Sequence, residues 1–266
     1  MSEDRPQGGV GMPGAAPGSA AAGAPPPRPS ALTDSAAGRL LGVLVAPGKT
    51  FDSIVRRPTW VLALVLVTVL SLITSLVVVQ HMDLASSVRE RIEKSGGSLS
   101  PEQVDQQVAM AEKVSKIAIP LAALVFVPLM YLAVALVFWL LMRLVGGEFR
   151  YPVSLAVSLH GMLPQTLAGL LSLPLILSHG LYSPDAIKRG VLASNLAFLA
   201  PEGASPAAVA LLGSVDLFTL WSLALLIIGY RRAGRTSAGA TAGVVIGVWL
   251  LYVLAKVGLA AAGIGR

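Results

Sequence analysis

The chain has 266 residues, of which 55% are hydrophobic and only 13% are charged. Soluble globular proteins are typically about 45 to 50% apolar and about 25% charged, so this composition excludes an ordinary soluble domain and favours a protein embedded in lipid. The formal net charge is +6. Membrane proteins carry such an excess in their cytoplasmic loops, and we therefore do not expect nucleic acid as a partner.

Several chemistries are excluded by residue type. The sequence has no cysteine, which excludes disulfides, thiolate nucleophiles and zinc–thiolate sites. Its three histidines, His81, His160 and His179, lack the spacing of metal ligands. We expect no metal site, no other cofactor and no catalytic residues.

Residues 1–38 consist almost entirely of Gly, Ala, Pro and Ser. Such a segment buries too little apolar surface to offset the loss of chain entropy, so we predict a disordered tail. It lacks the apolar run of a signal peptide, and we expect the first membrane span to act as the targeting signal. The membrane domain is then residues 39–266.

The stretch 39–58 is amphipathic. Its apolar side chains recur at i, i+3 and i+4 after a proline suited to the first turn of a helix, and cations lie beside them. This pattern is typical of a helix lying in the membrane surface, with cations near anionic headgroups. The alternative is a helix packed against cytoplasmic loops of the same protein. The side chains predicted to contact the membrane surface are Phe51, Ile54, Val55, Arg56 and Arg57.

Five apolar runs follow, each comparable to the roughly 20 residues that cross a bilayer. The first three contain no charge, whereas Asp216 interrupts the fourth and Lys256 the fifth. Aromatic residues near their ends are predicted interfacial anchors: Trp60, Trp139, Tyr151, Tyr182 and Tyr230. Five spans put the two termini on opposite sides. The predicted spans are 60–80, 117–142, 151–178, 207–230 and 241–263.

About 35 polar residues separate the first two spans. Leu84, Val88 and Ile92 repeat every four residues, and Ser100–Gln103 has the pattern of a capping box with proline at its first helical position. We predict a helical hairpin outside the bilayer core, whose second arm continues into the second span; a solvated linker is the alternative. Gly146 and Gly147 predict a tight reversal between spans two and three.

Charge predicts the orientation. With the amino terminus in the cytoplasm, the inner side carries eleven cations and five anions, and the outer side carries eight of each. The excess of Lys and Arg on one side follows the positive-inside rule. We therefore expect a cytoplasmic amino terminus and an external carboxyl terminus.

Three passages resemble bacterial members of the Yip1 membrane-protein family. They occur in the family's order around the predicted spans: Pro47–Ile54 with Arg57–Trp60, Gly146–Phe149 with Leu163–Gln165, and Asp216–Trp221 with Gly229. The resemblance covers residues 39 to about 262 and implies a five-span helical protein of the bacterial inner membrane.

Eukaryotic members of that family act in vesicle traffic and bind prenylated small GTPases, partly through soluble amino-terminal regions. Here that region is the Gly/Ala/Pro-rich tail, which departs from the pattern and puts a GTPase partner in doubt.

Asp216 and Lys256 are the charges predicted to lie inside spans, where a charge is costly and usually has a partner. Antiparallel neighbouring helices would bring the two to similar depth, which favours an Asp216–Lys256 ion pair. A protonated Asp216 that donates a hydrogen bond and a proton or ion relay remain alternatives. Lys256 could also extend to the surface without a partner.

His160, Pro164 and Gln165 fall together on the third span. Pro164 removes a backbone donor and should kink the helix, and a His or Gln side chain can satisfy the freed carbonyl or bridge to another helix. The functional alternative is a substrate pocket at the break, as in transporters.

These features predict an all-α bundle of five transmembrane helices with an amphipathic surface helix and an external hairpin. We expect a non-enzymatic membrane protein that organises lipids, other membrane proteins or further copies of itself. The alternative is a small-solute or ion transporter that uses Asp216, Lys256 and the break at Pro164.

Overall fold

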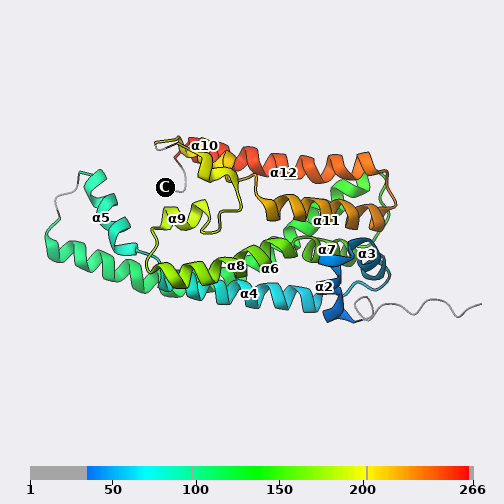
Figure 1. Cartoon of the computed structure of the whole chain (residues 1–266), viewed down its shortest axis with the longest axis horizontal. Helices are drawn as coiled ribbons and strands as arrows, with labels where there is room; N and C mark the ends of the chain where they lie inside the picture. The colour runs from blue at the N-terminus through cyan, green and yellow to red at the C-terminus, as the bar shows by residue number, and fades with distance from the viewer. Residues whose placement is uncertain (1–34, 97–98, 202, 264–266) are drawn as a thin grey trace, which may run out of the picture.

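The computed structural model describes residues 35–96, 99–201 and 203–263. Within these ranges the regular structure is helical and contains no strand, apart from isolated bridges that join Met82 to Tyr182 and Asn195 to Asp216. Most helices run side by side along the long axis of the bundle (Figure 1). The predicted all-α class is therefore confirmed.

The helices follow one another with short connections. They are α2 (Ala36–Val45), α3 (Pro47–Arg56), α4 (Val61–Gln80), α5 (Leu84–Lys94), α6 (Pro101–Leu144), α7 (Tyr151–Gly161), α8 (Leu163–His179), α9 (Pro184–Arg189), the 3₁₀-helix η1 (Leu196–Leu199), α10 (Pro206–Leu212), α11 (Leu217–Gly234) and α12 (Ala238–Ala261). Of the predicted tail, residues 1–34 lie outside the described part of the chain.

Four helical segments in the described ranges are long and apolar enough to cross a membrane: α4, α6, α7 with α8, and α12. The predicted span 207–230 is instead divided, because α10 ends at Leu212 and α11 begins at Leu217. α11 has 18 residues, which is about 27 Å of helix, and its last turn carries Arg231 and Arg232. Length and apolar composition together thus identify four spans in the described ranges, and the predicted fifth span is not confirmed.

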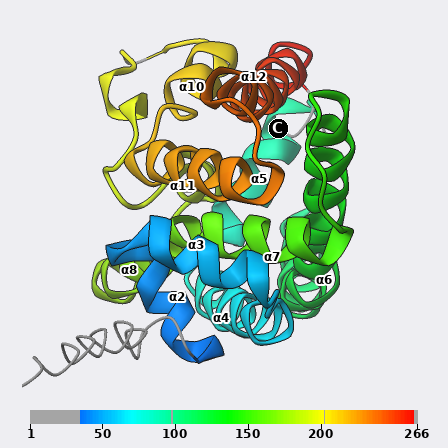
Figure 2. The same cartoon turned by 90° about the vertical axis from the view of Figure 1, so that its right-hand side faces the viewer.

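The bundle has two different ends (Figures 1 and 2). At the first, the α3 end, α2 and α3 lie beside the turn between α6 and α7 and the turn between α11 and α12. At the second, the hairpin end, lie α5, the start of α6, α9 and α10, and η1 packs against α10. Successive long helices run from one end to the other.

The best-buried part of the protein lies toward the α3 end, where α3, α7 and α11 meet. Glycines permit this approach. A Cβ atom on Gly229 would lie 2.7 Å from Val157 Cγ1 and 2.8 Å from Phe51 Cε1, and one on Gly161 would lie 2.7 Å from Leu226 Cδ2. Small residues of this kind let membrane helices pack closely.

This packing corrects the prediction for α3. Phe51 and Ile54 are both 0% exposed, so they belong to the protein core and do not contact lipid. These two side chains pack within the same protein, as in the alternative, but against helices α7 and α11 rather than against cytoplasmic loops. Val55 is half-buried, while Arg56 and Arg57 are exposed.

The exposed apolar surface lies on α2 instead. Leu41 is 63% and Val45 72% exposed, one helical turn apart. Arg39 of the same helix is buried, and its guanidinium donates to the Arg57 carbonyl at 2.8 Å and to Thr59 Oγ1 at 3.0 Å. These bonds fix α2 across the start of α4, with Leu41 and Val45 turned outward.

The structure contains the predicted hairpin. The Ser100 hydroxyl accepts from the Gln103 amide at 3.3 Å, and the Gln103 side chain accepts from the Ser100 amide at 2.9 Å, which completes the capping box. α6 then continues without interruption for 44 residues. α5 packs against it, and Arg89 pairs with Asp105 at 3.4 Å.

Candidate functional site

Exposed cations gather at the α3 end, on α3 and on the two neighbouring turns. The cations are Lys49, Arg56, Arg57, Arg143, Arg150, Arg231, Arg232 and Arg235. The anions in these segments are Asp52, which pairs with Arg232, and Glu148. This end is therefore strongly cationic, and cations and anions are far more evenly mixed at the hairpin end.

A cavity of about 500 Å³ opens among these charges. Three segments that are distant in the sequence form it: α3, the turn from α6 into α7, and the end of α11. Its lining residues are Val55, Gly146, Glu148, Phe149, Arg150, Val153, Ala233, Gly234 and Arg235.

The wall between α6 and α7 is a glycine turn, as predicted. Gly146 has φ +87°, a conformation that side chains disfavour. The Gly147 amide donates to the Met142 carbonyl at 2.8 Å. A Cβ atom on Gly234 would lie 3.3 Å from the Gly147 Cα, so the absence of a side chain at Gly234 lets the turn lie against α11.

Aromatic residues support this wall. Trp139 Nε1 donates to the Phe149 carbonyl at 3.0 Å, and the Phe149 ring lies 6.0 Å from the Tyr230 ring, centroid to centroid. The Arg143 guanidinium lies 4.6 Å over the Trp139 ring. These contacts hold Phe149 in the cavity.

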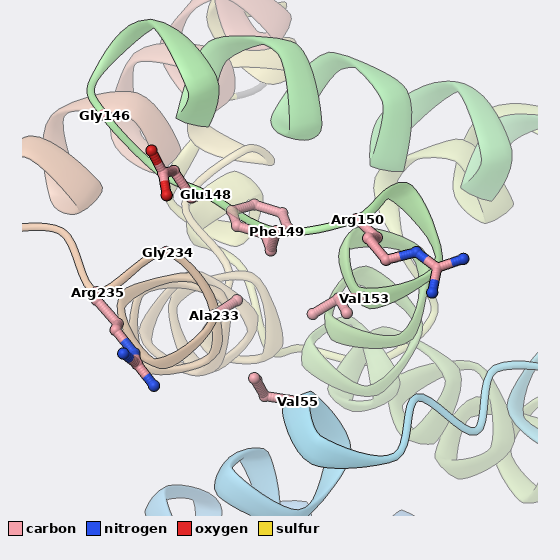
Figure 3. Close-up of a pocket in the computed structure, with 9 residues that line it drawn as sticks. All are labelled: Val55, Gly146, Glu148, Phe149, Arg150, Val153, Ala233, Gly234 and Arg235. Carbon is pink, nitrogen blue, oxygen red and sulfur yellow. The ribbon is translucent and has the colours of Figure 1, made fainter.

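Figure 3 shows Phe149, Val153 and Val55 facing the middle of the cavity, with charged side chains around them. The Arg150 and Arg235 guanidinium groups lie on opposite sides and extend outward. All three charged lining side chains are exposed, and those of Glu148, Arg150 and Arg235 have no hydrogen bond or ion pair within the described ranges. The cavity thus has apolar side chains at its floor, and the charged side chains at its rim have no partner within the described ranges.

Asp216, predicted to interrupt a continuous span, lies at the start of α11, where one helix ends and the next begins. Its carboxylate accepts from the Phe218 amide at 2.9 Å and the Thr219 amide at 3.1 Å, so it is the N-cap of α11. It also accepts from the Ser194 hydroxyl. These contacts give Asp216 a structural role that joins the segment before η1 to α11.

Lys256 is partly buried and donates to Ser214 Oγ at 3.2 Å. Since Ser214 precedes Asp216 by two residues, the similar depth expected for Asp216 and Lys256 is found. The expected ion pair is not: no ion pair joins them among the described residues. The capping bonds of α11 orient the carboxylate toward backbone amides instead.

The third predicted span breaks as expected, between Gly161 and Leu163, with Pro164 in the first turn of α8. Gln165 Nε2 donates to Thr219 Oγ1 on α11 at 3.0 Å, which is the predicted bridge to another helix. His160 is fully buried.

The orientation of the His160 ring follows from its one hydrogen bond. Nδ1 lies 2.8 Å from the Ala156 carbonyl. A carbonyl only accepts, so Nδ1 carries the proton and a neutral ring has an acceptor at Nε2. Within the described residues this Nε2 has no partner.

A buried hydroxyl network between α7 and α11 was not predicted. The Tyr230 hydroxyl lies 2.8 Å from Ser154 Oγ and 2.7 Å from Ser158 Oγ, and Ser154 Oγ donates to the Ala135 carbonyl at 2.7 Å. Tyr230, expected at the interface, is fully buried. The spacing of Ser154 and Ser158, one helical turn apart, was the available signal.

Apolar helices that run the length of the bundle, with charges concentrated at its ends, define a polytopic α-helical membrane protein. The chain belongs to the Yip1 domain family, whose model matches residues 41–259. Comparison with curated proteins and with solved structures gave no match. The family consists of non-enzymatic membrane proteins.

Proposed function

We propose that this protein is a non-enzymatic membrane scaffold that organises lipids, partner membrane proteins or further copies of itself. The observation that carries the proposal is the separation of two kinds of surface. Large apolar side chains such as Val65, Phe126 and Leu251 face outward along the spans, whereas exposed cations gather at the α3 end. The first surface suits lipid and helix contacts, and the second suits anionic groups.

Crosslinking in native membranes tests this function. A photoreactive residue at Phe126, which is exposed on α6, should capture defined membrane proteins or lipids. The matched control is the same residue at Tyr131, which is buried on the same helix and should capture neither. Equal, unselective labelling from both positions would contradict a scaffold role.

The proposal includes five membrane passages with the α3 end in the cytoplasm of a bacterial cell. α8 ends at the hairpin end and α12 begins at the α3 end, so α10 and α11 must return the chain between them. The excess of Lys and Arg at the α3 end supports its cytoplasmic placement. A reporter inserted after Arg235 should be cytoplasmic and one near Gly96 external; the reverse result would overturn the orientation.

A transporter or channel is the alternative. It is favoured by the break between α7 and α8 and by the buried His160 Nε2, for which the described residues supply no partner. Solute or ion flux in proteoliposomes that is abolished by His160→Ala would replace the scaffold proposal. We do not propose a small GTPase as a partner, because the amino-terminal region is the Gly/Ala/Pro-rich segment.

A further inference from the structure

The cavity at the α3 end lies where lipid headgroups are expected. Trp139, which holds its wall, and Trp60, at the start of α4, are of the type that marks the headgroup level in membrane proteins. The exposed Leu41 and Val45 of α2 lie at the same end of the bundle. An apolar surface and a cationic one side by side are characteristic of the membrane–water interface.

The floor and the rim of the cavity suit different parts of one molecule. Phe149, Val153 and Val55 offer apolar surface, which a glycerol backbone and the first methylenes of an acyl chain could cover. A soluble inorganic anion would leave that surface unused. The occupant should therefore be amphipathic.

The rim has both signs of charge. Arg150 and Arg235 are on opposite sides, and Glu148 lies on a third side. The carboxylate does not neutralise either guanidinium through an ion pair, so all three groups are available. A purely anionic headgroup would meet repulsion from Glu148, whereas a headgroup with a phosphate and an ammonium would match the whole rim.

Arg235 has an unusual backbone for its residue type. It is the C-cap of α11 with φ 53°, a left-handed conformation that glycine or asparagine usually fills. Gly234 lies one residue too early to serve. An arginine there costs conformational energy that glycine would avoid, which is consistent with a need for its side chain.

We propose that this cavity binds the headgroup of an aminophospholipid, with Arg150 and Arg235 at the phosphate and Glu148 at the ammonium. Rotation about the side-chain torsions can turn each guanidinium toward the occupant, since neither has a partner among the described residues. The inference rests on the proposed scaffold function and specifies which lipid class it recognises.

The test measures lipid retained by the full-length protein, purified in detergent and exposed to equal amounts of phosphatidylethanolamine, phosphatidylglycerol and phosphatidylcholine, by native mass spectrometry. The unchanged protein should retain phosphatidylethanolamine preferentially. Arg150→Gln and Arg235→Gly should each lower that retention roughly tenfold, as expected for the loss of a charge-assisted contact. Glu148→Gln should shift the preference toward phosphatidylglycerol.

Two controls separate the cavity from general surface charge and from misfolding. Arg56→Gln removes an exposed cation of the same end that does not line the cavity, and it should leave the preference unchanged. Arg235→Gly relieves the left-handed backbone, so its melting temperature should not fall.

Equal retention of the three lipids by the unchanged protein, or equal losses from Arg56→Gln and Arg235→Gly, would overturn the proposal. Soluble phosphoethanolamine that competes as well as the whole lipid would also overturn it, because the occupant would then be a free metabolite. Captured protein partners in the crosslinking experiment together with unselective lipid retention would leave the scaffold function standing and remove only this inference.

Discussion

The α3 end and the hairpin end differ in how closely distant helices pack. At the α3 end, Phe51, Val157 and Gly229 meet from three helices far apart in the sequence. At the hairpin end, α5, α9, α10 and α11 begin with polar caps that bond to amides two or three residues away. Serine caps of the same kind begin α2 and α12 at the α3 end. The difference between the two ends is therefore the close packing of distant helices, and substitutions should have unequal effects at the two ends.

The largest effect is expected at Gly229. Gly229→Val would place its side chain against Val157 and Phe51, whose atoms lie 2.7 and 2.8 Å from the position of the new Cβ. Overpacking of this kind costs about 1 to 3 kcal/mol or more, and we expect a clearly lower melting temperature in detergent. Gly243→Val is the control, since nothing lies within 4 Å of its Cβ position. Similar losses from both variants would show that α3, α7 and α11 are not closely packed.

A second effect concerns the hydroxyl network. Tyr230→Phe keeps the ring but removes the hydroxyl that bonds to Ser158, while Ser154 still donates to the Ala135 carbonyl. A buried hydroxyl left without a partner costs about 1 to 3 kcal/mol. Unfolding in denaturant should show this loss, which Tyr252→Phe, at an exposed position, should not reproduce. An unchanged free energy of unfolding in Tyr230→Phe would mean that water replaces the missing hydroxyl.

At the hairpin end, Asp216→Ala should cost about 0.5 to 2 kcal/mol through loss of the N-cap. Lys256→Met should have a smaller effect, and the double variant should lose the sum of the two, because Asp216 and Lys256 do not contact each other. The melting temperatures of the two single variants and the double variant test this additivity. Rescue of one change by the other would reveal the ion pair that the structure lacks.

The smallest effect is expected at Asp83, the N-cap of α5. The Ser86 amide donates to its carboxylate and lowers the pKa below the ordinary value of 3.8. Because the pKa of this carboxyl is lower in the folded than in the unfolded protein, the carboxylate stabilises the fold at pH values above the unfolded-state pKa. This contribution is lost as the pH falls through the folded-state pKa. Hydrogen exchange of the Ser86 amide should therefore be less protected at pH 3 than at pH 5. Asp83→Asn keeps a capping side chain without titrating and should show a smaller change.

The sequence predicted what local patterns determine. The Ser100–Gln103 capping box, the glycine turn at Gly146 and the break near Pro164 each depend on neighbouring residues, and each is found. Composition alone predicted the apolar spans. It could not distinguish α11 from a full-length span, because Asp216 caps a helix in the middle of an apolar run.

The candidate site depended on distant contacts and was largely missed. The pattern of Phe51 and Ile54 fits a lipid-facing helix as well as a buried one, and only the slot between α7 and α11 decides between them. The cavity combines Val55, Phe149 and Arg235 from three segments. The local sequence around each of them does not indicate that they meet. The predicted polar sites in this part of the chain rested mainly on charged residues inside spans. Ser154 and Ser158 carry no charge and were therefore missed.

The continuous α6 helix determines how far the hairpin projects beyond the rest of the bundle. Its polar first part, residues 101–116, is about 24 Å long at 1.5 Å per residue, and Figure 1 shows it reaching farther than α9 or α10 at the same end. A large object that approaches the hairpin end therefore meets the tip of α5 and α6 first. A shortened α6 should let such an object come correspondingly closer to the rest of this end.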